Sequence, residues 1–169
     1  GEVDNGGAGE ETFNIDVISW QNRADAWTEM QYNPTDNVGL IVGGRLANWF
    51  GSFQDSAAEP RATLYWQALE DTRISLGAGF NYQAPLPDET ADEVGNPDLK
   101  AERAIYGVVG LKQQFSDVFS FDLQFFTKQL DSLVSTVPFD FEQPDQVPYD
   151  NAGSGSVIGA ELLARLATS

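Results

Sequence analysis

The sequence contains no cysteine and no histidine. Without cysteine there is no disulfide framework, no thiolate metal site and no cysteine nucleophile. Without histidine the chain lacks the usual zinc ligand and the side chain that most often acts as a general base near neutral pH. Most familiar catalytic schemes are therefore excluded. We expect a protein that is not an enzyme and has no cofactor.

Positive charge is also scarce. The chain has 9 Lys+Arg against 26 Asp+Glu, which gives a formal net charge of -17 at pH 7. A surface of this sign repels the phosphate backbone of nucleic acids. Nucleic acid is therefore not expected among the partners.

A long hydrophobic run is missing as well. No stretch of about 18 apolar residues occurs, so the sequence predicts no transmembrane helix. A strand of a membrane barrel needs only about 9 to 11 residues with one apolar face. The missing helix is therefore no evidence against a membrane protein.

What the sequence does contain is alternation of apolar and polar residues. Between residues 118 and 127, Phe119, Phe121, Leu123 and Phe125 are separated by polar side chains, which is the period of a β-strand. Residues 74–83 repeat this pattern, and so do residues 20–32 except at Trp27. Each run alone fits a soluble antiparallel sheet equally well, because such a sheet also has one wet face.

Turn-forming residues divide the chain into seven predicted strands. Tight turns are expected at 34–37, 70–73 and 116–117, and longer segments at 53–59, 84–100 and 137–155. The strands between them are predicted at 14–33, 37–52, 60–69, 73–83, 101–115, 117–136 and 155–167.

Aromatic residues favour a membrane barrel over a soluble sheet. Membrane barrels carry aromatic girdles at both interfaces with water. Six aromatic side chains are predicted near strand ends: Tyr32, Trp49, Phe50, Phe53, Tyr82 and Phe115.

Two short motifs strengthen this interpretation. The first is Asn96-Pro97-Asp98-Leu99-Lys100-Ala101-Glu102, which follows the strand end Phe80-Asn81-Tyr82-Gln83-Ala84-Pro85-Leu86-Pro87. The second is Asp150-Asn151-Ala152-Gly153, which comes before Gly159-Ala160-Glu161-Leu162. In this order the landmarks resemble those of TonB-dependent outer-membrane receptors, over roughly residues 60 to 166.

The resemblance implies an all-β fold, an antiparallel up-and-down transmembrane β-barrel. Residues 1–169 would form a partial barrel of about seven strands, since family barrels have 22 strands and are filled by an N-terminal plug domain that this sequence does not show. It also implies a receptor in the outer membrane of a Gram-negative bacterium, which takes up a scarce nutrient such as a ferric siderophore. The implied partners are the TonB energy-coupling complex, acting through the plug, the outer-membrane lipid and a small-molecule nutrient.

Two acidic loops are the candidate ligand-binding elements, because exposed loops often carry binding residues. Their predicted contact residues are Asp88, Glu89, Asp92 and Glu93 in the first loop and Phe139, Asp140, Phe141, Glu142, Asp145 and Tyr149 in the second. Solvated loop charge is the alternative for the first loop, and packing of the loop on the barrel is the alternative for the second. The acids do not have the spacing of a calcium-binding EF-hand, so no metal site is predicted.

Two other functions stay open at this point. One is a soluble all-β carbohydrate-binding module, in which Trp20, Trp27, Trp49 and Trp66 form the core or stack on sugar. The other is a passive porin-like channel without a plug. The glycines at 153–159 do not form a phosphate-binding loop, because a strand-like pattern follows them and no lysine does.

Overall fold

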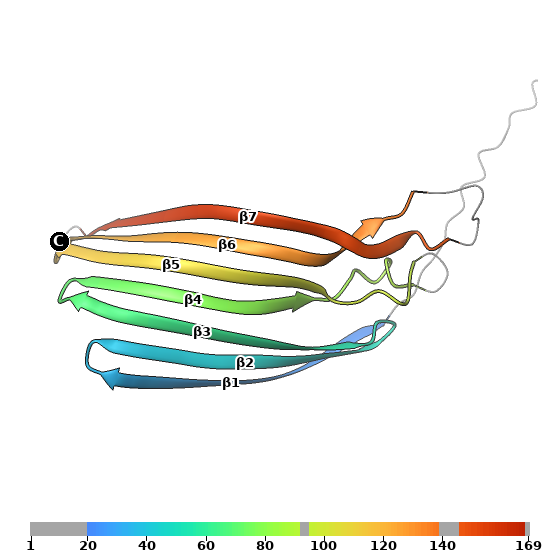
Figure 1. Cartoon of the computed structure of the whole chain (residues 1–169), viewed down its shortest axis with the longest axis horizontal. Coiled ribbons are helices and arrows are strands. Elements are labelled where there is room, and N and C mark those ends of the chain that lie inside the picture. Colours follow the sequence, from blue (N-terminus) through green and yellow to red (C-terminus); the bar gives the residue numbers. More distant parts are fainter. Residues whose placement is uncertain (1–19, 92–94, 139–145, 168–169) are drawn as a thin grey trace, which may run out of the picture.

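A computed structural model of the protein describes residues 20–91, 95–138 and 146–167. These residues form one sheet of seven antiparallel strands, each hydrogen-bonded to its neighbours in sequence (Figure 1). The strands are β1 (Gln21–Thr35), β2 (Val38–Gly51), β3 (Asp55–Leu69), β4 (Thr72–Gln83), β5 (Glu102–Ser116), β6 (Phe119–Thr136) and β7 (Tyr149–Leu166). The predicted all-β fold with seven up-and-down strands is confirmed, as a sheet that is not closed on itself. In the described ranges no helix is long and apolar enough to span a membrane.

The two ends of the sheet differ in how the strands are connected. At one end, here called the turn end, two residues join each strand pair: 36–37, 70–71 and 117–118. In the first turn the Val38 N–H donates to Thr35 Oγ1 over 3.1 Å. At the other end, the loop end, the connections are residues 52–54, 84–101 and 137–148. The predicted tight turns are therefore confirmed, and so are two of the three predicted longer connections, those before β5 and β7.

The third strand begins earlier than predicted. It starts at Asp55 and not at residue 60, so the prediction of a long segment at 53–59 is wrong. Residues Asp55 to Glu59 pair with β2 alone, because the ladder between β3 and β4 begins only at Arg61 opposite Gly79. Pro60, which has no N–H to donate, lies at this point where β3 separates from β4.

The seventh strand also begins earlier, at Tyr149 and not at residue 155. Its first residues pair with β6 across two irregularities in register, around Leu133. Ser132 there has a φ of 56°, a conformation that L-residues rarely adopt. These bulges interrupt the alternation of the two faces at the paired ends of β6 and β7. The sequence pattern therefore does not reveal that β7 begins at Tyr149. The predicted first strand began at residue 14, and residues 14–19 lie outside the described part of the chain.

The register gives the sheet two chemically different faces. On one, here called the apolar face, apolar side chains lie opposite one another across all seven strands, as in the row Tyr32, Leu40, Leu64, Leu76, Val109, Phe125 and Ala160. The other, the polar face, carries seven of the nine lysines and arginines: Arg23, Arg45, Arg61, Arg73, Lys112, Lys128 and Arg165.

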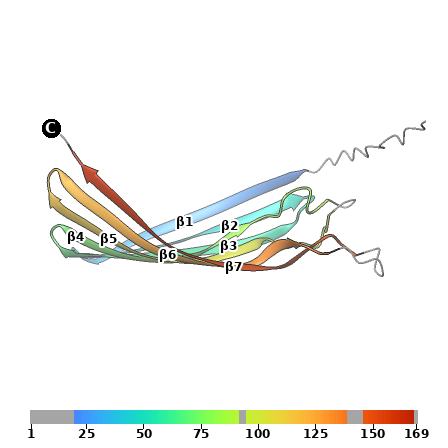
Figure 2. The same ribbon diagram turned by 90° about the horizontal axis from the view of Figure 1, so that it is seen from above.

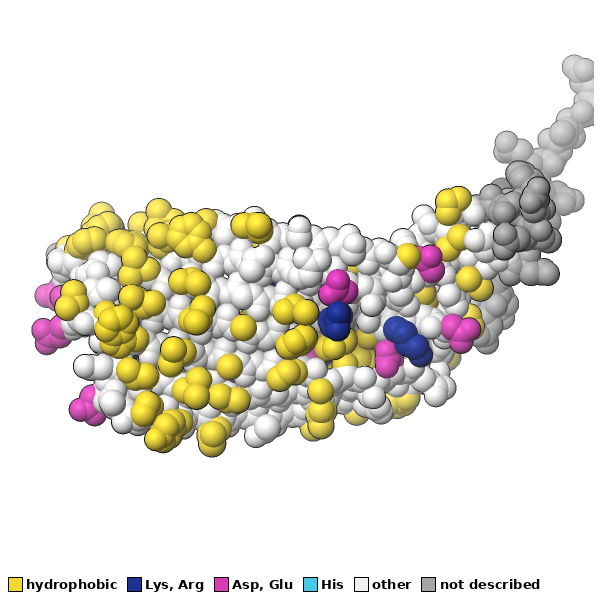
Figure 3. Space-filling view, viewed as in Figure 1, with side chains coloured by type: hydrophobic (Ala, Val, Ile, Leu, Met, Phe, Trp, Pro, Cys, Tyr) yellow, Lys and Arg dark blue, Asp and Glu magenta, His cyan; other side chains and the backbone are white. Residues whose placement is uncertain are grey.

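The apolar face is exposed over most of its area. Figure 2 shows the sheet curved and twisted, and Figure 3 shows hydrophobic side chains gathered over the apolar face, with charged groups toward its two ends. Ile158, Leu162 and Met30 are 84%, 68% and 66% exposed. A contiguous apolar surface of this extent marks an interaction with a membrane or another protein.

The buried hydrophobic core is small and lies at the loop end. It consists of Ala47, Trp49, Phe53 and Ala101, and the rings of Trp49 and Phe53 meet edge to face with centroids 6.0 Å apart. The prediction that Trp49 and Phe53 belong to an aromatic girdle is therefore wrong. Both side chains pack against the loop that precedes β5, because β3 and β4 separate there and leave space between them.

Three glycines lie under aromatic rings of the adjacent strand. Tyr65 covers Gly39, Tyr106 covers Gly79, and Phe126 covers Gly159, each pair directly opposite in register. A β-carbon on Gly39 would lie 2.1 Å from the Tyr65 ring. The absence of a side chain therefore lets each ring lie against the sheet.

Substituting Gly39 tests this packing. We expect Gly39→Ala to destabilise the complete protein by about 1–3 kcal/mol, because overpacking forces neighbours from their positions. Tyr65 cannot move freely, since its hydroxyl accepts from Gln31 Nε2 at 2.6 Å and donates to Asn33 Oδ1 at 2.9 Å. Urea unfolding in detergent micelles measures the change. Gly107→Ala is the matched control, because the nearest atom to its new β-carbon would be 3.7 Å away; equal stability of the two variants would contradict the packing argument.

Candidate functional site

The three arginines in the loop-end part of the polar face are each paired with a carboxylate of the same sheet. Arg45 Nε donates to Glu59 Oε2 at 2.6 Å, Arg61 lies 3.0 Å from Glu29, and Arg23 lies 2.9 Å from Asp25. The Arg23 guanidinium also lies 5.0 Å from the centroid of the Trp49 ring. The positive charges of these three arginines are therefore balanced by carboxylates within the loop-end part of the polar face.

Glu59 is the one buried acid among these pairs, with 5% of its surface exposed. Besides the bond to Arg45, its second carboxylate oxygen accepts the backbone N–H of Tyr82 at 3.0 Å. This bond crosses the gap where the β3–β4 ladder has ended. Both oxygens are therefore satisfied, which a buried carboxylate requires.

The two motifs of the sequence meet at the loop end. The side chain of Asn151 accepts the Lys100 N–H at 2.7 Å, and its amide group donates to the Lys100 carbonyl at 3.1 Å and to the Ser132 carbonyl at 2.9 Å. Asn96 Nδ2 donates to the Tyr149 carbonyl at 2.8 Å. The two asparagines therefore bind the loop before β5 to the start of β7, by occupying backbone groups as a neighbouring strand would.

The rest of the first motif supports the same connection. Asn96 Oδ1 accepts the Asp98 N–H at 2.9 Å, Leu99 is buried, and Glu102 Oε1 accepts the Val134 N–H at 2.9 Å. Pro97 and Lys100 are exposed, as is Ala152, whereas Gly153 lies close against Leu133. In this structure the motif residues hold the loop in place.

Asp150 belongs to the same network. Its Oδ1 accepts the Ser135 hydroxyl at 2.6 Å and the Ala152 N–H at 3.1 Å. The Ser135 hydroxyl bond, and then the Ala152 N–H, lower the pKa of the Asp150 carboxyl below its ordinary value. The charged carboxylate is therefore the form that this end of the sheet favours.

Only part of the predicted ligand-binding set lies in the described residues. Asp88 is exposed, and Glu89 turns back on its own loop, where its Oε2 accepts the Leu86 N–H at 2.7 Å. Tyr149 is half-buried at the start of β7. The remaining predicted residues lie outside the described part of the chain: Asp92, Glu93, Phe139, Asp140, Phe141, Glu142 and Asp145. Contact of these ten residues with a ligand stays a prediction.

Sequence reasoning did not identify the polar-face charge pairs. The sequence predicts Glu59 within the long segment 53–59 and gives its partner Arg45 no role. The alternation of side chains could have identified them, because Arg45 and Glu59 occupy positions on the polar face of two adjacent strands and lie directly opposite each other. Among the described residues no group of three or more acids, histidines or cysteines is arranged to hold a metal ion.

The apolar face has the dimensions of a membrane-facing band. Along β7 its apolar positions run from Ile158 to Leu166, which is nine residues. A tilted strand of a membrane barrel needs about 9 to 11 residues to cross the bilayer. Aromatic side chains flank the band at the turn end (Tyr32, Trp66, Phe115, Phe119 and Phe121) and at the loop end (Phe50 and Phe80).

The apolar face carries one pair of charged residues in the described strands. Arg103 and Asp131 lie directly opposite each other and form an ion pair at 3.1 Å. Both are near the loop end, beyond the apolar positions of β5 and β6. The apolar band therefore contains no charged side chain in the described strands, and the two charged residues beside it form an ion pair.

Comparison with known proteins gives a family match and several similar structures. The family described as TonB dependent receptor-like, beta-barrel matches residues 3–167. No curated protein matches the chain.

Three of the similar structures are each much longer than this chain. The FrpB iron transporter from Neisseria meningitidis, in its apoprotein form, is 18% identical, with a TM-score of 0.68 over 88% of this chain and 24% of its own. The siderophore receptor PirA from Acinetobacter baumannii is 17% identical, with a TM-score of 0.70 over 86% and 26%. The alcaligin outer-membrane receptor FauA from Bordetella pertussis is 18% identical, with a TM-score of 0.67 over 85% and 27%. The chain thus spans about a quarter of the length of these proteins, and at this identity they show that the fold is shared.

The Asn151 contacts predict a local effect on the loop before β5. We expect Asn151→Ala to remove three hydrogen bonds and to destabilise the loop by about 2 kcal/mol, so that amides of residues 95–101 exchange about thirtyfold faster. Hydrogen–deuterium exchange with mass spectrometry on the complete protein measures this. Asn48→Ala is the control, since Asn48 is exposed and makes no side-chain hydrogen bond to the described residues. Unchanged exchange at residues 95–101 would show that Asn151 does not hold the loop.

The Asp150 bonds predict a pH effect with a defined sign. Because the folded-state pKa is lowered from the ordinary 3.8, the stability that this carboxylate contributes is present above that value and is lost as pH falls through the folded-state pKa. Urea unfolding of wild type and Asp150→Asn should therefore differ at pH 7 and converge as the pH falls below about 4. A difference that stayed constant from pH 7 to pH 3 would contradict this assignment.

Proposed function

The chain belongs to the TonB-dependent receptor-like β-barrel family, and on this basis we propose that it forms part of the barrel wall of an outer-membrane receptor. The receptor would transport a scarce nutrient into a Gram-negative cell and would catalyse no reaction. Residues 1–169 would belong to one partial barrel domain, and a plug domain elsewhere in the protein would fill the lumen.

The observation that carries this proposal is the segregation of charge between the two faces. Seven of nine cations lie on the polar face, and the charges on the apolar face of the described strands are one ion pair near the loop end. A wall between lipid and a polar lumen needs this arrangement, because an unpaired charge is costly in lipid and acceptable in the lumen.

The connections indicate the orientation. Barrels of this kind have short periplasmic turns and longer extracellular loops. The two-residue turns would therefore face the periplasm, and the loops at 84–101 and 137–148 would face outward. The hydrogen bonds of Asn96 and Asn151 would then hold the first of these loops at the outer mouth of the barrel.

We propose a ferric siderophore as the nutrient. The support comes from similar structures, of which one is named an iron transporter and another a siderophore receptor. The acidic and aromatic residues predicted in the two outward loops would contact this ligand, and the TonB complex would supply energy through the plug.

Of the two other candidates, the carbohydrate-binding module fits poorly. Side chains such as Ile158 and Leu162, which a soluble sheet would bury, are more than half exposed here. A passive channel would have the same kind of wall, so energy dependence is the property that distinguishes it from a receptor.

Uptake in cells tests the proposal. A strain that lacks the complete gene should lose uptake of radioactive iron from at least one siderophore in a panel under iron limitation. Loss of TonB should abolish the same uptake, because the transport is energy-coupled. The measurement is cell-associated iron after rapid filtration.

The controls separate the alternatives. Reintroducing the gene should restore uptake, and fractionation should place the protein in the outer membrane. Solute uptake that needs the gene and persists without TonB would identify a passive channel. Recovery of the protein from a detergent-free soluble fraction would contradict the membrane assignment.

A further inference from the structure

Two cations lie side by side in the turn-end part of the polar face. Arg73 on β4 is directly opposite Lys112 on β5, so both side chains project from the same face of neighbouring strands. Like charges in directly opposed positions of an antiparallel pair destabilise it. On its other side Lys112 lies opposite Asp122 of β6, whereas Arg73 lies opposite the uncharged Gln67 of β3. Arg73 therefore has no acid directly opposite it in either neighbouring strand.

The structure holds the Arg73 side chain in a defined direction. Its Nε donates to Gln67 Oε1 at 3.1 Å, and its guanidinium carbon lies 5.4 Å from the centroid of the Tyr65 ring. Gln67 is itself fixed, because its Nε2 donates to the carbonyls of Leu69 and Glu70, both at 3.0 Å. The terminal guanidinium nitrogens, which can donate to two oxygens at once, are left without a partner among the described residues.

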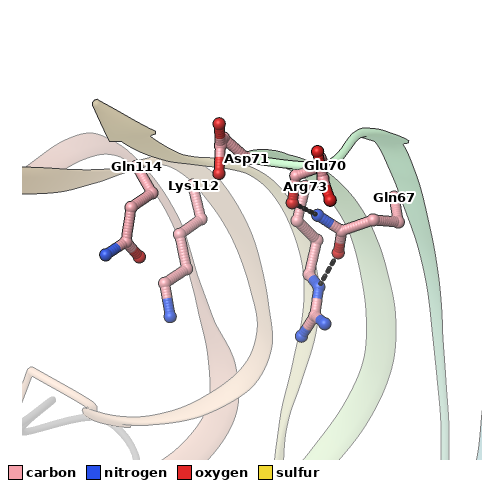
Figure 4. A pocket seen from close by; sticks show the side chains of 6 residues that line it. All are labelled: Gln67, Glu70, Asp71, Arg73, Lys112 and Gln114. Atoms are coloured by element: carbon pink, nitrogen blue, oxygen red, sulfur yellow. Dashed lines mark hydrogen bonds between the residues drawn. The ribbon is translucent and has the colours of Figure 1, made fainter. Parts of the chain in front are cut away.

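A hollow of about 300 Å³ joins the two cations. Its lining is Gln67, Glu70, Asp71, Arg73, Lys112 and Gln114. Figure 4 shows the side chains of Arg73 and Lys112 extending to the same side of the sheet, while the carboxylates of Glu70 and Asp71 stay beside the turn. Neither cation forms an ion pair with any residue in the described ranges. This volume suits a small molecule.

The three arginines of the loop-end half are arranged differently from Arg73. Arg23, Arg45 and Arg61 each lie within 3.0 Å of a carboxylate. Neighbouring β-strands could have placed an acid opposite Arg73 in the same way, and they place Lys112 there instead. Asp122 lies opposite Lys112 on its other side, and Glu70 and Asp71 line the hollow, but none of these acids forms an ion pair with Arg73 or Lys112. Both cations can therefore still contact an anion from outside the sheet.

We propose that the hollow between Arg73 and Lys112 binds a small anion through its carboxylate or phosphate oxygens. The guanidinium would hold two of the oxygens and the Lys112 ammonium a further one, which would relieve the repulsion between the two cations. This proposal depends on the fold and on the two cations, and binding at equilibrium requires no transport. Absence of anion binding would therefore leave the proposed transport function untouched, and absence of iron uptake would leave the anion site untouched.

Calorimetric titration of the complete protein in detergent tests the site. The probes are succinate and inorganic phosphate, each added at constant ionic strength in chloride, because screening alone changes the interaction. We expect at least one of the two anions to bind. Arg73→Gln and Lys112→Gln should each weaken that binding about tenfold or more. Binding of succinate alone would identify a carboxylate site, and binding of phosphate alone a phosphate site.

Matched variants complete the test. Arg61→Gln removes a charge from the same face where Glu29 already neutralises it, so anion affinity should not change. Arg73→Lys keeps the charge without the fork of donors and should bind with intermediate affinity, which guards against misfolding of the glutamine variants. No binding of either anion to the wild type, or equal binding by Arg73→Gln, Lys112→Gln and the wild type, would overturn the proposal.

Discussion

The two-residue period of the strands is the constraint on which the rest of this structure depends. Each strand turns alternate side chains to opposite faces, and the register keeps seven strands in step so that the faces stay chemically distinct. A slip of one residue in any strand would bring polar side chains such as Lys112 or Glu161 onto the apolar face. The two-residue turns help to fix this register, because they leave little freedom in how neighbouring strands align.

Where the period is interrupted, polar side chains replace the backbone ladder. β3 separates from β4 beyond Pro60, and the Glu59 carboxylate accepts the Tyr82 N–H that a strand would otherwise have bonded. The register between β6 and β7 shifts near Ser132, and the Asn151 side-chain amide donates a hydrogen bond to the Ser132 carbonyl. These interruptions lie at the loop end, where the sheet gives way to its long connections. They keep backbone groups paired while the chain leaves the regular sheet.

The motifs and the acidic residues of the loops differ in what the structure says of them. Asn96 and Asn151, which carry the family resemblance, bond the loop before β5 to the start of β7. This gives a physical reason why the two motifs occur together in one chain. Glu89, by contrast, is a predicted ligand-binding residue because of its charge, and its carboxylate accepts a backbone N–H of its own loop. In this structure Glu89 therefore helps to shape the loop.

The sequence by itself determined the all-β class, the seven strands, the tight turns and the family, because alternation and turn residues are local patterns that survive without knowledge of partners. It did not determine where β3 and β7 begin, since β3 starts with β2 as its only partner and the start of β7 is shifted by bulges. It also misplaced Trp49 and Phe53, whose burial depends on space left by two diverging strands. Only the tertiary structure brought Glu59 to Arg45 and Tyr82, and Arg73 opposite Lys112, because the register between strands decides which distant residues become neighbours.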